Sequence, residues 1–394
     1  MARELAITVY LSVFRLIFTL FKQFPQKEKT TFVASFGENI LYTVNELEKH
    51  MKDQVVILKT SQCKTDFNHS SNRTILEFEI LHVIDWLRSI YHLATSQKVL
   101  VDNYYGFLAV TDFRPDVQCI QLWHAAGAIK KFGLEDPSIE NRSARANRRF
   151  RKVYDRFDFV IVGSEKMASI FKQSFDLSNE RILRTGIPRT DFFFDDEAKE
   201  AAKNSLVADY PVINEKKVML YAPTYRDNEL DIGELKLDIE KMYQAFKHDY
   251  VLLLRLHPAI NGEFQNKYPG FVINVSGNYN INHLLVITDI LITDYSSIPF
   301  EFSLLNKPMV FFAYDLDQYA IDRGFWETYE DLVPGPVVEN TNDLVDVIRN
   351  RTFDLERIKE FASQWNQFSQ GASSKRLIQT FYTEMEGYSK VMQR

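Results

Sequence analysis

After residue 25, segments with the hydrophobic pattern of a β-strand alternate along the chain with segments that have the pattern of an α-helix. Short runs rich in β-branched and aromatic residues, bounded by polar turns, predict strands at residues 32–36, 55–58, 98–101, 119–123 and 159–162. Helical spacing lies between them, as at residues 80–96 and 142–155. The same alternation restarts with strands at residues 217–221, 250–256, 271–275, 290–293 and 309–312. Because strands that alternate with helices favour parallel sheets, the sequence predicts two α/β domains.

The first apolar stretch, residues 5–24, is about as long as a membrane span, but Arg15 lies at its centre. A helix here would carry polar residues on one side, namely Thr8, Ser12, Arg15, Thr19 and Lys22, and apolar residues on the other, namely Val9, Val13, Leu16, Ile17, Leu20 and Phe24. The pattern predicts an amphipathic helix in a membrane interface. The alternative is a helix that packs on its own domain. No small-residue cleavage site follows, so we do not expect a cleaved secretory signal.

With 394 residues, of which 45% are hydrophobic, the chain is long enough for two cores. We predict an N-terminal helix at residues 1–27, one domain at residues 28–200 and a second at residues 201–394. The polar, acidic stretch 195–209 marks the boundary between the domains. The helical run 342–394 either completes the second domain or crosses back to the first.

The formal net charge of −6 argues against a nucleic-acid partner, since such proteins carry a basic footprint. Two distant cysteines, Cys63 and Cys119, indicate neither a disulfide framework nor a zinc site, and a reducing cytoplasm fits this usage. Positive charge gathers instead on one helical face that carries Arg142, Arg145, Arg149 and Lys152. We predict that this face contacts an anionic membrane surface or a phosphorylated acceptor; the alternative is a solvated helix face.

In open α/β sheets, ligands bind outside the carboxyl ends of the strands, so polar residues after predicted strands are candidates for function. His124 follows the strand at residues 119–123 and is placed to act as a general base. Three small residues come next, which permits a ligand to approach the backbone closely. The alternative is a structural histidine with a satisfied hydrogen bond.

Arg255 and His257 follow the strand predicted at residues 250–256 and, two residues apart, share one face of it. Arginine and histidine together suit a diphosphate, although an arginine paired with a local carboxylate is the alternative. Ser296 and Ser297 lie between a buried strand and a helix, where hydroxyl groups bind an anion or simply cap the helix. Glu301, one turn later, faces a sugar or glycerol hydroxyl or is structural.

The weaker motifs at residues 186–191 and 221–226 also bring polar groups to strand ends. Taken in order, these motifs resemble those of the CDP-glycerol glycerophosphotransferase family of teichoic acid synthesis over residues 30–385. The stretch 123–136 is most similar to that of the glycerol-phosphate primases. One departure is Ala125-Ala126-Gly127, where many members have Gly-Thr-Pro.

The resemblance implies a glycosyltransferase-B-like fold of two Rossmann-like domains, with the acceptor bound by residues 28–200 and CDP-glycerol by residues 201–394. It implies that His124 is the base, that Arg255 and His257 engage the diphosphate, that Ser296 and Ser297 bind phosphate and that Glu301 meets glycerol or ribose. Our further substrate-binding candidates are Gly127, Lys130, Lys131, Arg189 and Thr224.

The implied reaction transfers glycerol phosphate from CDP-glycerol to an undecaprenyl-pyrophosphate-linked disaccharide (ManNAc-GlcNAc), releases CMP and primes wall teichoic acid synthesis at the cytoplasmic membrane face. The alternatives are a chain-extending transferase of the same family, a nucleotide-sugar enzyme of the same fold and a non-catalytic membrane scaffold. No cofactor or metal is expected, because Asp315-Leu316-Asp317 is more typical of a solvated loop than of a divalent-ion site. Whether copies of the chain associate is left open.

Overall fold

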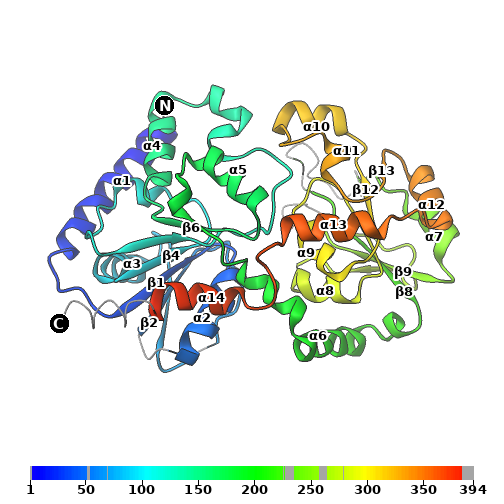
Figure 1. The fold of residues 1–394 in the computed structure, drawn as a ribbon, viewed down its shortest axis with the longest axis horizontal. Coiled ribbons are helices and arrows are strands. Elements are labelled where there is room, and N and C mark those ends of the chain that lie inside the picture. Colours follow the sequence, from blue (N-terminus) through cyan, green and yellow to red (C-terminus); the bar gives the residue numbers. More distant parts are fainter. Residues whose placement is uncertain are drawn as a thin grey trace. The chain divides into compact units, whose positions relative to one another are not determined.

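The computed structural model describes residues 2–50, 54–68, 70–224, 226, 235–256, 264–277 and 279–383. The chain forms two compact units, each built around one parallel sheet (Figure 1). Unit 1 comprises Met1–His124, Phe132–Asp191 and Phe368–Arg394, and unit 2 comprises Ala125–Lys131 and Phe192–Gln367. The short segment Ala125–Lys131, directly after His124, therefore belongs to the second unit.

Unit 1 contains a seven-stranded sheet in the order β3-β2-β1-β4-β5-β6-β7, in which every pairing is parallel. The strands are β1 (Lys29–Ala34), β2 (Gln54–Lys59), β3 (Arg73–Glu77), β4 (Lys98–Val101), β5 (Gln118–Gln121), β6 (Phe159–Ile161) and β7 (Ile182–Leu183). Strands β1 and β4 are buried at every position, as expected for central parallel strands covered on both faces. The strand order reverses between β1 and β4.

The α-helices of unit 1 are α1 (Ala2–Phe21), α2 (Glu38–His50), α3 (Val83–Thr95), α4 (Ala144–Tyr154), α5 (Glu165–Phe175) and α14 (Ser373–Ile378). Shorter 3-10 turns lie at Gly106–Val110, Gly133–Glu135, Pro137–Asn141 and Asn179–Arg181. Helix α14 lies in unit 1, where its first two backbone N–H groups are accepted by the carboxylate of Asp191. The chain thus crosses back to unit 1 after residue 367.

Unit 2 contains a six-stranded sheet in the order β10-β9-β8-β11-β12-β13, again with parallel pairings only. The strands are β8 (Lys217–Tyr221), β9 (Tyr250–Leu254), β10 (Val272–Asn274), β11 (Ile290–Thr293), β12 (Met309–Phe312) and β13 (Val337–Val338). The helices are α6 (Asp196–Asp209), α7 (Ile239–Phe246), α8 (Ile281–Ile287), α9 (Ile298–Phe302), α10 (Leu316–Arg323), α11 (Tyr329–Leu332), α12 (Thr341–Asn350) and α13 (Leu355–Trp365). The strand order reverses between β8 and β11.

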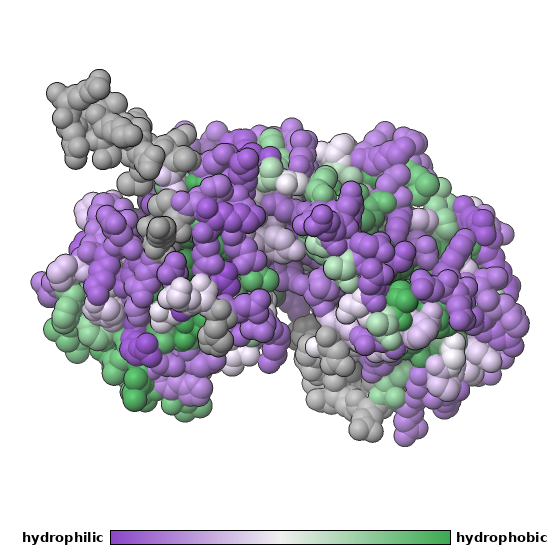
Figure 2. Space-filling model, turned by 90° about the horizontal axis from the view of Figure 1, so that it is seen from below, coloured by the Kyte–Doolittle hydropathy of each residue, from purple (hydrophilic) through white to green (hydrophobic). Residues whose placement is uncertain are grey.

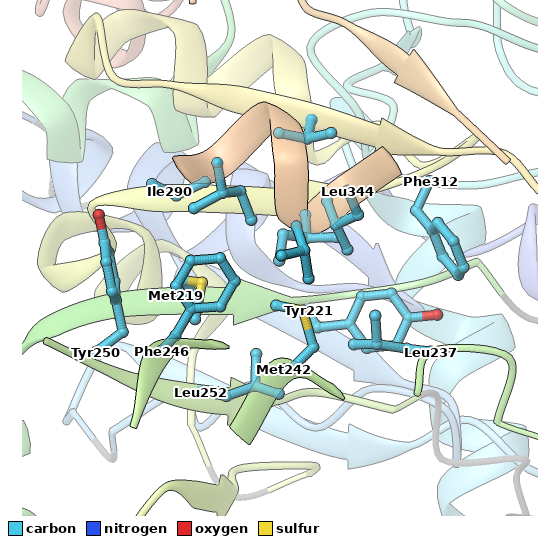
Figure 3. Close-up of a cluster of buried hydrophobic side chains, with 14 of the residues drawn as sticks. Met219, Tyr221, Leu237, Met242, Phe246, Tyr250, Leu252, Ile290, Phe312 and Leu344 are labelled. Carbon is cyan, nitrogen blue, oxygen red and sulfur yellow. The ribbon is translucent and has the colours of Figure 1, made fainter. Parts of the chain in front are cut away.

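One face of the second sheet packs against α7 and α12 through a continuous apolar cluster (Figure 3). Met219 and Leu252 from the sheet, Met242 from α7 and Leu344 from α12 are all fully buried in it. Residue alternation along β8 and β9 directs Met219, Tyr221 and Leu252 to this face. This core holds the carboxyl ends of β8 and β11 in fixed positions.

The predicted alternation of strands and helices is confirmed, and four strand predictions match β4, β8, β11 and β12 at both ends. Three short strands, β3, β7 and β13, were missed. Strand β9 ends at Leu254, so the prediction that it continues through residue 256 is wrong. The polar stretch 195–209 forms α6, for which the side chain of Asp195 accepts the N-cap hydrogen bond.

Helix α1 uses two faces in different ways. Leu11, Phe14 and Phe18 are buried against unit 1, where the ring of Phe14 contacts those of Trp86 and Phe107. The apolar side predicted from the sequence is largely exposed, at Leu5, Val9, Val13, Leu16 and Leu20, and Phe24 beyond the helix end is also exposed. The alternative of a helix that packs on its own domain is confirmed for one face, and because the other face presents an apolar stripe, the membrane interface stays a prediction.

These two faces predict different responses to truncation. Phe14→Ala removes a fully buried ring and should lower the free energy of unfolding by about 3–5 kcal/mol. Leu16→Ala, two residues along the same helix, removes an exposed side chain and should change it by less than about 0.5 kcal/mol. Urea unfolding followed by tryptophan fluorescence measures both, and the reverse order would contradict this placement of α1.

Candidate active site

The candidate base lies at the carboxyl edge of the first sheet, beside its strand-order reversal. His124 follows β5, and its Nδ1 lies 3.0 Å from the backbone carbonyl oxygen of Asp102, which follows β4. Since a carbonyl can only accept, Nδ1 carries the proton and donates it there. Nε2 then carries a lone pair and is the atom that can take a proton from a substrate.

The imidazole of His124 lies between two aromatic rings. The ring of Phe36 stacks on it with centroids 3.9 Å apart and planes 10° apart, and the ring of Trp123 stacks at 4.3 Å and 28°. Two rings cannot share one face of an imidazole at these distances, so they cover opposite faces. The ring of Phe132 continues the column by stacking on Trp123 at 5.0 Å. We call these four side chains the aromatic stack.

The turn that carries the stack is strained. Trp123 has φ of 55°, in the left-handed region that costs a residue with a side chain about 1–2 kcal/mol. The side chain of Asn39 donates to the carbonyl oxygens of Leu122 and Trp123, and Gln121 Oε1 accepts the N–H of Trp123. These bonds hold the turn in the conformation that presents His124.

Asp102, which follows β4, fixes the Phe36 end of the aromatic stack. Its fully buried carboxylate accepts the backbone N–H groups of Ser35, Phe36 and Gly37 at 2.9, 3.0 and 2.7 Å, and also the hydroxyl of Tyr105. The backbone carbonyl oxygen of Asp102 also accepts the hydrogen bond from Nδ1 of His124. One residue therefore fixes both the turn that carries Phe36 and the orientation of the imidazole. Burial raises the pKa of Asp102, while these donors act to lower it.

The surroundings keep His124 neutral. Desolvation lowers its pKa to about 4, and the positive charge of Arg189 acts in the same direction. Arg189 is held by its backbone N–H to Asn39 and by an ion pair with Glu38 at 3.4 Å. At neutral pH the imidazole is therefore uncharged, with its proton on Nδ1, and Nε2 can accept a second proton.

In unit 2, the residues at the strand-order reversal form an ion cluster. The guanidinium of Arg226, after β8, bonds Asp294 at 2.6 Å and Asp315 at 2.9 and 3.0 Å. The rings of Tyr295 and Tyr319 lie 5.0 and 5.1 Å from it, within cation–π range. The expectation that Asp315 lies in a solvated loop is wrong, because this carboxylate also accepts the hydroxyl of Tyr295.

Several predicted donor-side residues follow the same two strands, β8 and β11, as Arg226 and Asp294 of this cluster. Thr224 donates its N–H to Asp294, and its buried hydroxyl oxygen has no hydrogen-bond partner within the described part of the chain. The hydroxyl groups of Ser296 and Thr293 are hydrogen-bonded to each other. Ser297 is the N-cap residue of α9, and its side chain makes no capping hydrogen bond. Glu301 is buried within α9.

Arg255 lies just beyond β9 and donates to the carbonyl oxygen of Tyr279 at 2.8 Å. His257 lies outside the described residues. The predicted arrangement of Arg255 and His257 on one strand face does not hold for Arg255, because the strand has already ended.

The segment after His124 packs within unit 2. A Cβ on Gly127 would lie 2.4 Å from the ring of Phe300, so a close contact within the protein requires glycine here. Lys130 pairs with Phe325 in an isolated bridge, and its ammonium lies 5.9 Å from the ring of Tyr319. Burial lowers its pKa to about 8. The Lys131 ammonium lies 6.0 Å from the ring of Trp326.

The basic face of α4 is mostly engaged with its own chain. Arg149 forms an ion pair with Glu4 of α1 at 3.2 Å, and Arg145 reaches the hydroxyl of Thr8 at 3.5 Å. Arg142 bonds Ser138 and Asp136. Lys152 is exposed. Helix α4 therefore fixes α1 to unit 1.

Sequence reasoning missed Phe36, Asp102 and Asn39, and it placed Arg226 in the motif at residues 221–226 without naming it as a site residue. Phe36 and Asp102 come within two residues of a strand end, which was the available signal, but an isolated aspartate or phenylalanine at a strand end is common. Among the described residues, no group of three or more His, Cys, Asp or Glu side chains is arranged to hold a metal ion.

The fold is glycosyltransferase-B-like, with two Rossmann-like domains. It is similar to a solved variant of the wall teichoic acid polymerase TagF, with a TM-score of 0.81 over 99% of both chains at 22% sequence identity. The chain also matches the family described as CDP-Glycerol:Poly(glycerophosphate) glycerophosphotransferase over residues 16–383, and it belongs to that family.

Named relatives agree with this membership. The chain is 35% identical to the teichoic acid glycerol-phosphate primase of Bacillus subtilis (strain 168), over 95% of this chain and 97% of that one. It is 36% identical to the teichoic acid ribitol-phosphate primase of Bacillus spizizenii, over 75% of this chain and 78% of that one. The chain is a glycerophosphotransferase of teichoic acid synthesis.

The lowered pKa of His124 predicts a specific response of stability to acid. The unfolded chain protonates this histidine below about pH 6.5, while the folded chain does so only near pH 4, so stability is lost as the pH falls through this window. His124→Gln removes the effect. Its free energy of unfolding should fall by about 1–3 kcal/mol less than that of the wild type between pH 7 and pH 4. Urea unfolding across this range measures it.

His82→Gln is the matched control for this comparison, because His82 is exposed. It should follow the wild type. Equal acid responses of the wild type and of His124→Gln would contradict the desolvated site.

Proposed function

We propose that this enzyme transfers glycerol phosphate from CDP-glycerol to an undecaprenyl-pyrophosphate-linked disaccharide and releases CMP, as the priming step of wall teichoic acid synthesis. The observation that carries the proposal is the neutral His124 at the strand-order reversal, with Nδ1 fixed by a carbonyl and Nε2 left to accept a proton. The similarity to a glycerol-phosphate primase along nearly the whole of both chains supports the priming step.

In the proposed reaction, an acceptor hydroxyl oxygen attacks the glycerol-bearing β-phosphorus of CDP-glycerol. The bond between this phosphorus and the bridging oxygen breaks, CMP leaves, and the hydroxyl proton passes to Nε2 of His124. Catalysis then consists of positioning, proton acceptance and stabilisation of charge on the phosphoryl oxygens. The aromatic stack and Asp102 contribute by fixing the direction of the lone pair.

Unit 1 is proposed to bind the acceptor and unit 2 the donor. On the donor side, Arg255 and His257 engage the diphosphate, Ser296 and Ser297 bind phosphate, and Glu301 meets glycerol or ribose. The buried hydroxyl of Thr224, which has no hydrogen-bond partner among the residues that the structure describes, supports a ligand contact beside the Arg226 cluster. Gly127, Lys130, Lys131 and Arg189 remain candidates for substrate contact. No cofactor or metal ion is required for these roles.

A chain-extending transferase of the same family is the second candidate. Its support is the likeness of the fold to the polymerase TagF. The two functions share donor chemistry and differ in how many units each acceptor receives.

The enzyme is further proposed to bind the cytoplasmic membrane surface peripherally. Helix α1 is long and apolar enough to cross a membrane, but crossing would remove Phe14 and Phe18 from the core of unit 1. Ten of the fourteen large apolar side chains that are exposed in the described part of the chain lie either along α1 and at Phe24 or at the start of α3. The second group is Ile80, Leu81, Val83 and Ile84.

The rings of Tyr10 on α1 and Trp86 on α3 are in contact, so the two exposed groups lie on neighbouring elements. A patch of apolar surface is visible on one side of the molecule in Figure 2. Exposed Arg145 and Arg148 on α4, which contacts α1 through Glu4 and Thr8, provide positive charge for anionic headgroups.

The reaction is tested by CMP release from CDP-glycerol in EDTA, with and without a lipid-linked disaccharide. We expect acceptor-dependent release of one equivalent, and a rate roughly 10²–10⁴-fold lower for His124→Ala because the base is lost. Many equivalents would identify a chain-extending enzyme. Acceptor-independent turnover, or an unchanged rate in the variant, would contradict the proposal.

Membrane binding is tested by sedimentation with vesicles that contain phosphatidylglycerol. Leu16→Glu and Leu81→Glu should each weaken binding by about tenfold or more. Each variant loses the free energy that a leucine side chain gains when it moves from water into the membrane. Ile321→Glu is the matched control, because Ile321 is 74% exposed on α10 of unit 2. Equal loss in all three variants, or no binding by the wild type, would exclude this surface.

A further inference from the structure

Phe36 is an exposed aromatic residue with no place in the membrane surface. It follows β1 at the strand-order reversal, and 46% of its surface is accessible. A phenylalanine so exposed leaves apolar area in water without any gain from burial. Its position beside the candidate base suggests that a ligand covers it.

The backbone of Phe36 is held on both sides. Its N–H donates to the buried carboxylate of Asp102, and its carbonyl oxygen accepts the hydroxyl of Thr65 at 2.8 Å. Gly37 has φ of 89°, and a Cβ there would lie 2.5 Å from Thr65 Oγ1, so this turn requires glycine. The exposed ring is thus part of a fixed turn.

One face of the Phe36 ring is already covered. His124 stacks on it at 3.9 Å, and Trp123 and Phe132 continue the column behind the imidazole. Phe36 is therefore the terminal ring of the aromatic stack. Its accessible area is the outer face and edge, one ring away from Nε2 of His124.

The chemistry of this outer face suits a sugar ring. An aromatic face carries partial negative charge, which attracts weakly positive C–H groups. A pyranose presents C–H groups on its faces and hydroxyl groups at its rim. A pyranose stacked on the outer face of Phe36 lies one ring away from the imidazole, so a second sugar linked at its rim can pass the edge of Phe36 and reach the level of His124.

We propose that Phe36 binds the apolar face of one sugar of the acceptor disaccharide and so places a hydroxyl group of the linked sugar beside Nε2 of His124. This inference rests on the proposed transfer to a saccharide. It adds an acceptor-binding residue that follows β1 and lies far in sequence from the His124 motif.

The test compares Phe36→Leu and Phe36→Trp in steady-state transfer to a saccharide acceptor. Phe36→Leu should raise the KM for the acceptor about three- to tenfold, with the KM for CDP-glycerol unchanged, because stacking on the ring is lost. Phe36→Trp keeps an aromatic face and should leave the acceptor KM close to the wild-type value. Phe194→Leu is the matched control, since Phe194 is 47% exposed in unit 2, and it should match the wild type.

Two kinetic outcomes would overturn the inference. A lower kcat and a shifted pH profile with an unchanged acceptor KM would mean that Phe36 acts only by holding His124. A raised KM for CDP-glycerol alone would assign the ring to the donor.

A binding measurement separates this inference from the proposed reaction. Saturation-transfer NMR with a soluble N-acetylhexosamine disaccharide should show contact with the wild type, and a several-fold weaker contact with Phe36→Leu. This result would support the sugar-stacking role even if no transfer of glycerol phosphate were found. Equal contact with both proteins, or none with the wild type, would overturn it.

Discussion

Both units depend on one constraint. In each parallel sheet, the strand order reverses between two neighbouring central strands. At such a reversal, the connections after the two neighbouring strands diverge to opposite sides of the sheet, which leaves a crevice at their carboxyl ends. In unit 1 this position lies between β1 and β4, and it gathers Phe36, Asp102 and His124 from three different connections. In unit 2 it lies between β8 and β11, and it gathers Arg226 and Asp294.

The two reversals are stabilised by different means. In unit 1, a buried carboxylate accepts backbone N–H groups, so the charge of Asp102 is distributed over one turn and fixes it. In unit 2, a largely buried arginine bonds two carboxylates among tyrosine rings. Neither arrangement leaves a buried charge without a partner, which would destabilise the fold by several kcal/mol. Both keep the residues after the strands in one conformation.

The stacked imidazole shows how packing determines chemistry. Aromatic rings on both faces exclude water and lower the pKa of His124, so the proposed base stays neutral at neutral pH, with a proton on Nδ1 and none on Nε2. The strained turn at Trp123 and the carbonyl oxygen of Asp102 fix the direction of the Nε2 lone pair, and in the proposed reaction this orientation compensates for weak basicity. The strain is localised where the site needs it, and Asn39 and Gln121 offset part of its cost.

The sequence by itself determined the two parallel sheets, several strands to the residue, the amphipathic pattern of α1 and the place of His124, because periodicity and strand ends are local properties. Only the tertiary structure decided that α1 buries Phe14 and Phe18 while Leu16 and Leu20 stay exposed, that Ala125–Lys131 joins unit 2, and that Asp102 and Phe36 contact His124. These contacts join residues far apart in the chain. They depend on the order in which strands pair, which no local pattern of hydrophobic and polar residues records.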